Sequence, residues 1–123
     1  MPQTKIFGIQ EYLNPIKNQL SVVIHSCFVD VLQYPPDKRF HRFFAMDKSD
    51  FIFPPDKSQS YLIIEISMFE GRSVEVKKNL IRLLLKRINE KFRISYNDIE
   101  ITIFETPRYN WGLKGVCGDE LDV

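Results

Sequence analysis

Cysteine, glycine, tryptophan and net charge are all scarce in this chain of 123 residues. It has two cysteines, five glycines and one tryptophan, and 17 Lys and Arg oppose 16 Asp and Glu for a formal net charge of +1. Cys27 and Cys117 have neither a CxxC partner nor a histidine cluster, which excludes a zinc-binding pattern and favours reduced thiols in a cytoplasm. The balanced charge gives no bulk attraction to nucleic acid or to anionic lipid.

Long hydrophobic runs and the common catalytic motifs are absent as well. No window approaches the ~18 apolar residues of a membrane span, and the N-terminus does not resemble a secretory signal. GxGxxG, Walker A, HExxH and GxSxG motifs do not occur, so we predict neither a cofactor nor a metal. Hydrophobic residues make up 44% of the chain, which suffices for the core of one domain over residues 1–123. We expect a cytoplasmic protein without membrane or nucleic-acid partners.

The first half of the chain has the pattern of a strand, a helix and a second strand. The apolar run 6–9 predicts the first strand, and residues 42–46 predict the other. Between them, apolar residues recur at helical spacing up to Val31, with Asn14 as the expected N-cap and Pro15 at the first helical position. The segment 35–37, with two prolines, should end this helix.

The second half has the same order. Residues 61–69 form the strongest predicted strand, Ser73 is the expected N-cap of a helix that continues to Ile88, and 99–104 alternate as a half-buried strand. Sliding one half over the other by 60 positions keeps the hydrophobic phase, and superposes Ile6 on Ile66, Leu20 on Leu80, Val23 on Leu83 and Ile24 on Leu84.

This pattern predicts an α+β fold made of two tandem β-α-β units, residues 1–46 and 61–104. A linker over 47–60 joins them, and 105–123 form a C-terminal tail. Right-handed crossovers would place both helices on one face of a four-stranded mixed sheet. The other face would then be bare and apolar, so we expect other subunits to cover it.

Three positions could carry chemistry. Removal of Met1 would give Pro2 a free secondary amine, and an α-amino group titrates near ~8 before burial and nearby cations lower its pKa. Arg72, in the turn Glu70-Gly71-Arg72-Ser73 before a helix, could hold a carboxylate bidentately. The alternatives are that Pro2 is only a start residue and that Arg72 is an exposed arginine paired with Glu70 or Glu75.

The tail from Glu105 holds the single tryptophan, Trp111, and three of the five glycines. Such a segment is an irregular loop that packs its aromatic residue against another part of the protein. Trp111 could wall a pocket or anchor the tail on a neighbouring subunit, and the sequence leaves both interpretations open.

These segments together resemble the tautomerase superfamily, which includes 4-oxalocrotonate tautomerase, malonate semialdehyde decarboxylase and macrophage migration inhibitory factor. The resemblance lies in the Met-Pro start before KIFGI, in LIIEISMFEGRSVEVKKNLI and in IEITIFETPRYNWGLKG. It implies the fused, trimer-forming version of the fold and a keto–enol tautomerase acting on a small 2-oxo or enol carboxylic acid. Pro2 would be the general base, Arg72 and Arg42 would bind the carboxylate, and Trp111 would be the aromatic residue of the C-terminal hairpin.

Several features leave other functions open. Lys57 stands where many fused relatives have an arginine, and Asp37, Glu105 and Asp119 are the candidates for the water-activating acid of hydratases, dehalogenases and decarboxylases. If Met1 stays attached, Pro2 is an amide and cannot act as a base, which would make the protein a catalytically silent assembly or ligand-binding member. An RNA-binding ferredoxin-like domain has the same element order, but its aromatic-basic motif is missing.

Overall fold

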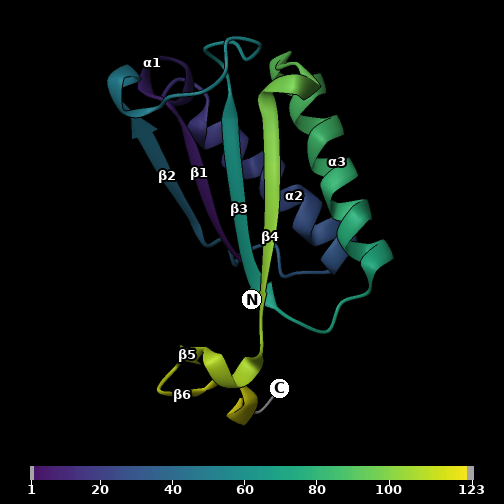
Figure 1. Cartoon of the computed structure of the whole chain (residues 1–123). Coiled ribbons are helices and arrows are strands. Elements are labelled where there is room, and N and C mark those ends of the chain that lie inside the picture. Colours follow the sequence, from purple (N-terminus) through teal and green to yellow (C-terminus); the bar gives the residue numbers. More distant parts are fainter. Residues whose placement is uncertain (1, 122–123) are drawn as a thin grey trace.

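The computed structural model describes residues 2–121 and shows two successive β-α-β segments followed by a small hairpin (Figure 1). Met1, on whose removal the proline hypothesis depends, lies outside the described residues. The strands and α-helices are β1 (Gln3–Ile9), α1 (Gln10–Leu13), α2 (Lys17–Leu32), β2 (His41–Met46), β3 (Leu62–Phe69), α3 (Val74–Phe92), β4 (Ile99–Thr106), β5 (Gly112–Leu113) and β6 (Val116–Cys117). The short 3-10 helices are η1 (Lys48–Asp50), η2 (Tyr96–Asp98), η3 (Arg108–Asn110) and η4 (Gly118–Glu120).

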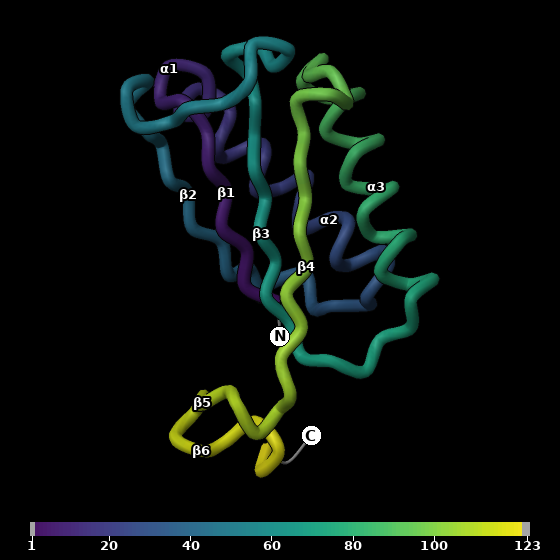
Figure 2. The backbone as a smooth tube through the Cα atoms, in the orientation of Figure 1, coloured from purple at the N-terminus to yellow at the C-terminus, as the bar shows by residue number. Residues whose placement is uncertain are grey.

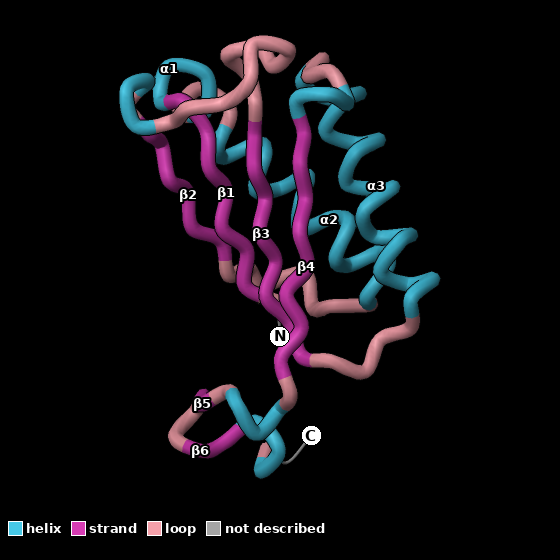
Figure 3. The backbone as a smooth tube through the Cα atoms, viewed as in Figure 1, coloured by secondary structure: helices cyan, strands magenta, loops and turns pink. Residues whose placement is uncertain are grey.

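Strands β1 to β4 form one mixed sheet in the order β2-β1-β3-β4 (Figure 3). Strand β1 is parallel to β2 and β3 is parallel to β4, whereas β1 and β3 pair antiparallel at the centre, with Lys5 opposite Glu65. Helices α2 and α3 lie side by side on one face of the sheet (Figure 2). The predicted α+β fold, with its mixed sheet and two helices on one face, is therefore confirmed.

The core lies between the sheet and the two long helices. Strand β3 turns Ile64 and Ile66 inward, and helix α3 meets them with Leu80 and Leu84, all fully buried. The helical spacing of the apolar residues thus identified the buried faces correctly, because one stripe of each helix faces the sheet. None of the described helices is long and apolar enough to cross a membrane.

The expected start of the first long helix is wrong. A short helix, α1, precedes it, and Asn14 ends α1 in a helical backbone conformation with its N–H donated to the carbonyl of Gln10. An N-cap needs an extended backbone, so Asn14 cannot have that role. Helix α2 begins only at Lys17, without a side-chain cap. In contrast, Ser73 caps α3 as predicted, since its hydroxyl accepts the N–H of Val76 at 3.1 Å.

The face of the sheet opposite the helices carries several large apolar side chains. Phe7 and Phe44 stack there with ring centroids 4.7 Å apart. Phe44 is 41% exposed and Phe104 is 49% exposed. We call this surface the open face. Such a group of exposed aromatic side chains is uncommon on the surface of a monomeric protein.

One end of the sheet gathers three parts of the chain. The start of β1 lies there, beside the ends of β3 and β4 and above the hairpin β5–β6 (Figure 1). Because β3 and β4 are parallel, the residues that follow each of them emerge at the same edge. Residues from the start, middle and end of the sequence are thereby brought close together.

Candidate functional site

A pocket of about 270 Å3 opens at this end of the sheet. Pro2 is buried and lines this pocket, and Leu32, Met68 and Phe69 supply apolar walls. The full lining consists of Pro2, Leu32, residues 68–72 and Arg108. The structure therefore brings Pro2 and Arg72, two of the residues singled out in the sequence, to one cavity.

The turn between β3 and α3 places Arg72 at the pocket. Gly71 has φ of +122°, a backbone conformation that side chains with a Cβ rarely adopt, and this lets the chain leave the strand sharply. Ser73 then caps the helix. Among residues 2–121, Arg72 forms no ion pair, and Glu75 lies 3.7 Å from Arg82 instead. Arg72 is exposed, as the alternative interpretation expected, but it is not paired with Glu70 or Glu75.

The tail is fastened to the sheet through Phe69, the last residue of β3. The Trp111 ring meets the Phe69 ring edge-on at 4.9 Å, and the Arg108 guanidinium lies 4.7 Å from the centre of the same ring. Gly118 packs on Phe69 as well and donates its N–H to the carbonyl of Trp111 at 2.7 Å. Trp111 thus anchors the tail within this chain. It contacts Phe69, which lines the pocket, but does not line the pocket itself.

We expect Gly118→Ala to detach this tail. An added Cβ would lie 2.5 Å from the Arg108 carbonyl oxygen and 3.0 Å from the Phe69 ring. Because the carbonyl oxygen belongs to the backbone, it cannot move aside as easily as the end of a flexible side chain. Overpacking of this kind costs about 1–3 kcal/mol. Fluorescence of the single tryptophan should shift to the red as Trp111 loses Phe69. Gly112→Ala is the matched control, because nothing lies within 4 Å of its added Cβ. An unchanged emission spectrum of Gly118→Ala would contradict this packing.

Arg42 lies apart from the pocket. It projects from β2 on the open face and donates a hydrogen bond to the Gln3 amide oxygen at 2.9 Å. In the described chain, the pocket lining contains neither Arg42 nor Trp111. Within this chain, the two residues that the resemblance adds to Pro2 and Arg72 therefore do not line the same pocket.

The candidate acids and Lys57 also lie outside the pocket lining of the described residues. Asp37 is exposed in the turn before β2. Lys57 donates to the Asn97 carbonyl oxygen at 2.8 Å, just before the start of β4, whereas the pocket lies beyond the end of that strand. Glu105 forms a 2.7 Å ion pair with Lys77.

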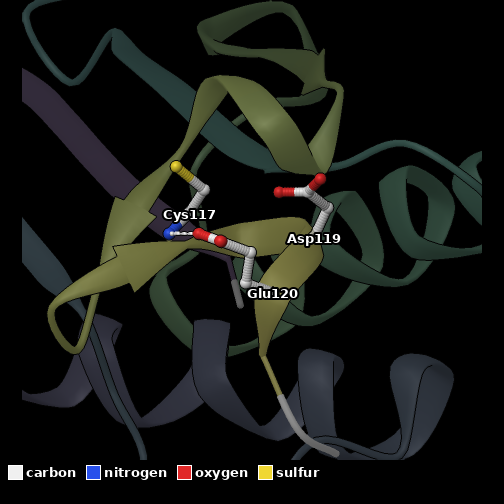
Figure 4. A group of neighbouring side chains, drawn as sticks. All are labelled: Cys117, Asp119 and Glu120. Atoms are coloured by element: carbon white, nitrogen blue, oxygen red, sulfur yellow. Dashed lines mark hydrogen bonds between the residues drawn. The ribbon is translucent and has the colours of Figure 1, made fainter.

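Asp119 belongs to an exposed group in the tail, with Cys117 and Glu120 (Figure 4). One potential ligand atom of each lies within 4.8 Å of the others. The carboxylate of Glu120 already accepts the backbone N–H of Cys117 at 2.9 Å, and its hydrogen bond to the thiol raises the pKa of Cys117. All three residues are exposed, and the Glu120 carboxylate is engaged within the turn itself.

Arg108 is the pocket residue that the sequence analysis missed. It lies two residues after the end of β4, whereas Arg72 lies three residues after the end of β3. The signal was present, because the ends of two parallel strands share an edge and a basic residue soon after each would meet there. It could be recognised only after β3 and β4 were known to be neighbours.

A second polar cluster lies between α2 and the start of β2. The Ser21 hydroxyl is 2.7 Å from Nδ1 of His41, and the Arg39 guanidinium donates to the same hydroxyl at 3.4 Å. Burial, followed by the nearby His25 and Arg39, lowers the pKa of His41 to about 4. Residue His25 itself is buried, and its Nε2 lies 3.0 Å from the carbonyl of Pro35. His41 is therefore neutral in the folded protein at neutral pH.

This cluster predicts a loss of stability in mild acid. The unfolded chain binds a proton at His41 near its usual pKa of 6.5, whereas the folded chain binds it only near about 4. Between these values the unfolded state holds more protons, so the free energy of unfolding should fall by roughly 1 kcal/mol per pH unit as the pH drops. Urea denaturation at several pH values measures this slope. His41→Gln should flatten it, and an equal slope in both proteins would refute the assignment.

The sequence is similar to a tautomerase family model and to individual tautomerases. A family model described as "Tautomerase enzyme" matches residues 38–114. The chain is 24% identical to the probable tautomerase YusQ of Bacillus subtilis (strain 168) over 98 residues, which cover 76% of this chain and 77% of that protein. It is 35% identical to the 2-hydroxymuconate tautomerase of Comamonas testosteroni over 57 residues, 46% of this chain and 90% of that protein.

The same fold occurs in solved structures. Native fused 4-OT superposes with a TM-score of 0.84 at 17% identity and covers 97% of this chain and 98% of its own. FG41 malonate semialdehyde decarboxylase inhibited by 3-bromopropiolate gives 0.79 at 23% identity, over 89% and 87% of the two chains. A fused 4-OT described as a symmetric trimer gives 0.79 at 15% identity, over 94% of each chain.

Proposed function

The chain belongs to the tautomerase family, and from that premise we propose that it isomerises a small 2-oxo or enol carboxylic acid with Pro2 as its base. The observation that supports this proposal is the shared pocket, in which Pro2 and Arg72, an arginine without an ion pair among the described residues, line one cavity of about 270 Å3. Proton transfer next to a carbonyl needs a base and a cation at the developing oxyanion, and these two residues meet that need.

The step moves one proton from oxygen to carbon. The neutral Pro2 amine removes the hydroxyl proton of the enol, the electron pair shifts to form the carbonyl, and the protonated amine returns the proton to carbon. Apolar walls and two guanidinium groups around Pro2 favour its neutral form. Arg72 binds the substrate carboxylate and stabilises negative charge on the reacting oxygen. Trp111 helps to exclude water by holding the tail against Phe69.

The working assembly in this proposal is a homotrimer. The open face exposes Phe44 and Phe104, and contact with other subunits would bury both. Among the structures with this fold, one fused 4-OT is a symmetric trimer and another is an asymmetric trimer. Arg42 lies on the open face, so its role in carboxylate binding requires a site on a neighbouring subunit.

An enol-to-keto assay tests the proposed activity. Protein with Met1 removal verified by intact mass is given 2-hydroxymuconate or phenylenolpyruvate, and the ultraviolet absorbance of the enol is followed. We expect enzyme-dependent loss of the enol with at least one of the two. If verified protein accelerates neither, the tautomerase proposal is wrong and the chain is better described as a non-catalytic member of its family.

A further inference from the structure

Arg108 contacts no group of the substrate in the reaction outlined above, yet it lines the same pocket as Pro2 and Arg72. It comes from η3, at the start of the tail, whereas Arg72 comes from the turn before α3. The pocket therefore has cationic groups supplied by two independent segments of the chain. One guanidinium is enough to bind one carboxylate bidentately, so the second is available for another anionic group.

The position of Arg108 is fixed by the ring of Phe69. The guanidinium carbon lies 4.7 Å from the ring centroid, within the range of a cation–π contact. Phe69 is itself 8% exposed, and Trp111 and Gly118 pack around the same ring. A planar guanidinium lying against a fixed ring loses little further freedom when it binds an anion.

The local charges leave Arg108 available for a ligand. Within the described residues, the ion pairs involve Lys77, Arg82 and Arg87, so neither pocket arginine is neutralised by a carboxylate. Glu70 lines the pocket as well, and it keeps more than ion-pair distance from both guanidinium groups. Unpaired cations at one cavity attract anions and disfavour ligands without a matching charge.

We propose that Arg108 is a second anion-binding residue of this pocket and that it makes the site select ligands with two carboxylates over ligands with one. This inference rests on the proposed function for its assignment of the first carboxylate to Arg72. Phe69 is a positioning residue for the second carboxylate, because it touches Arg108 rather than the ligand's charge. The tail would then determine specificity, whereas the turn before α3 provides the common carboxylate contact.

The test compares two ligands that share a carbon skeleton. trans,trans-Muconate carries a carboxylate at each end, whereas sorbate carries one. Calorimetric Kd values at one fixed ionic strength should show muconate binding about tenfold or more tighter, as expected for a charge-assisted contact. Arg108→Ala should bring the ratio of the two Kd values close to one and leave the Kd of sorbate unchanged. Arg108→Lys should keep part of the preference.

Two further variants separate the local role from general effects. Arg82→Ala removes the same charge from an exposed part of α3 and should keep the full preference. Phe69→Leu removes the ring under the guanidinium and should lower the ratio of the two Kd values, and the ratio is the readout because Phe69 also lines the pocket. If Phe69→Leu does not fold, Arg108→Ala still decides the outcome because Arg108 is exposed.

The inference is overturned if the wild type does not prefer muconate or if Arg108→Ala retains the preference. Because binding is measured without turnover, this result is distinct from failure of the tautomerase proposal. Loss of the preference in Arg108→Ala, in a protein that isomerises neither enol, would support the anion site and refute the activity. Turnover that depends on Pro2, together with an unchanged ligand preference in Arg108→Ala, would do the reverse.

Discussion

Pro2→Ala should lower kcat/KM for enol isomerisation by about 100-fold or more, the scale on which a positioned general base contributes. Alanine also permits removal of Met1, so the variant keeps a free amine in the pocket. That amine is primary and lacks the ring that fixes the direction of the proline lone pair. Because Pro2 is buried among apolar residues, a reoriented amine has little room to recover the geometry. Initial rates of enol loss measure the effect.

A blocked N-terminus gives the stricter form of this experiment. A protein that retains an extension before Pro2 has an amide nitrogen there, whose lone pair is delocalised and cannot take a proton. We expect rates at background level from that protein. Pro55→Ala, in an exposed loop far from the pocket, is the matched control and should keep full activity. Full activity of Pro2→Ala or of the extended protein would eliminate Pro2 as the base.

Arg72→Ala should have an effect of similar size, because it removes both the carboxylate contact and the cation beside the reacting oxygen. Loss of one such donor typically lowers kcat by about 100- to 1000-fold. A rise in KM should accompany the fall in kcat, since the carboxylate is bound in the ground state as well. Steady-state kinetics with a substrate that carries one carboxylate separates the two parameters.

Two substitutions show whether the geometry or only the charge of Arg72 matters. Arg72→Lys keeps the charge and loses the planar fork, so it should recover part of the loss and remain clearly below the wild type. Arg82→Ala removes an equal charge from the same helix region, where the side chain of Arg82 is 65% exposed, and should leave both parameters unchanged. Equal activity of Arg72→Ala and Arg82→Ala would exclude Arg72 from the site.

Much of the fold could be predicted from hydrophobic spacing alone. Leu20 and Ile24 on α2, and Leu80 and Leu84 on α3, repeat at helical intervals and all are buried. The start of α2 could not be predicted, since Asn14 before Pro15 has the form of a helix beginning and instead closes α1. Local chemistry allowed both arrangements, and the short helix that precedes Asn14 determined which one formed.

The candidate site was less accessible to sequence reasoning. Arg72 follows a recognisable strand, turn and cap, so its place at the edge of the sheet could be predicted. Arg108 depends on which strands are neighbours and on Gly118 packing against Phe69, and both are tertiary contacts between distant residues. Arg42 lies at the Pro2 end of the sheet but on the open face, and its position in a strand could not show whether a site there is completed by another chain, so its role stays a prediction.

The antiparallel pairing of β1 with β3 makes the two ends of this strand pair equivalent in backbone but not in side chains. With Lys5 opposite Glu65, a local two-fold rotation carries Pro2, beside Met68, onto Leu62, beside Gly8. At that opposite end Leu62 is buried, and its side chain lies 3.0 Å from where a Gly8 Cβ would be. The Pro2 end of the strand pair thus carries a pocket lined by Arg72 and Arg108, whereas at the other end the side chain of Leu62 occupies the corresponding space. The pairing of β1 with β3 is symmetric, whereas its two ends differ: the candidate site lies at one, and packed core side chains fill the other.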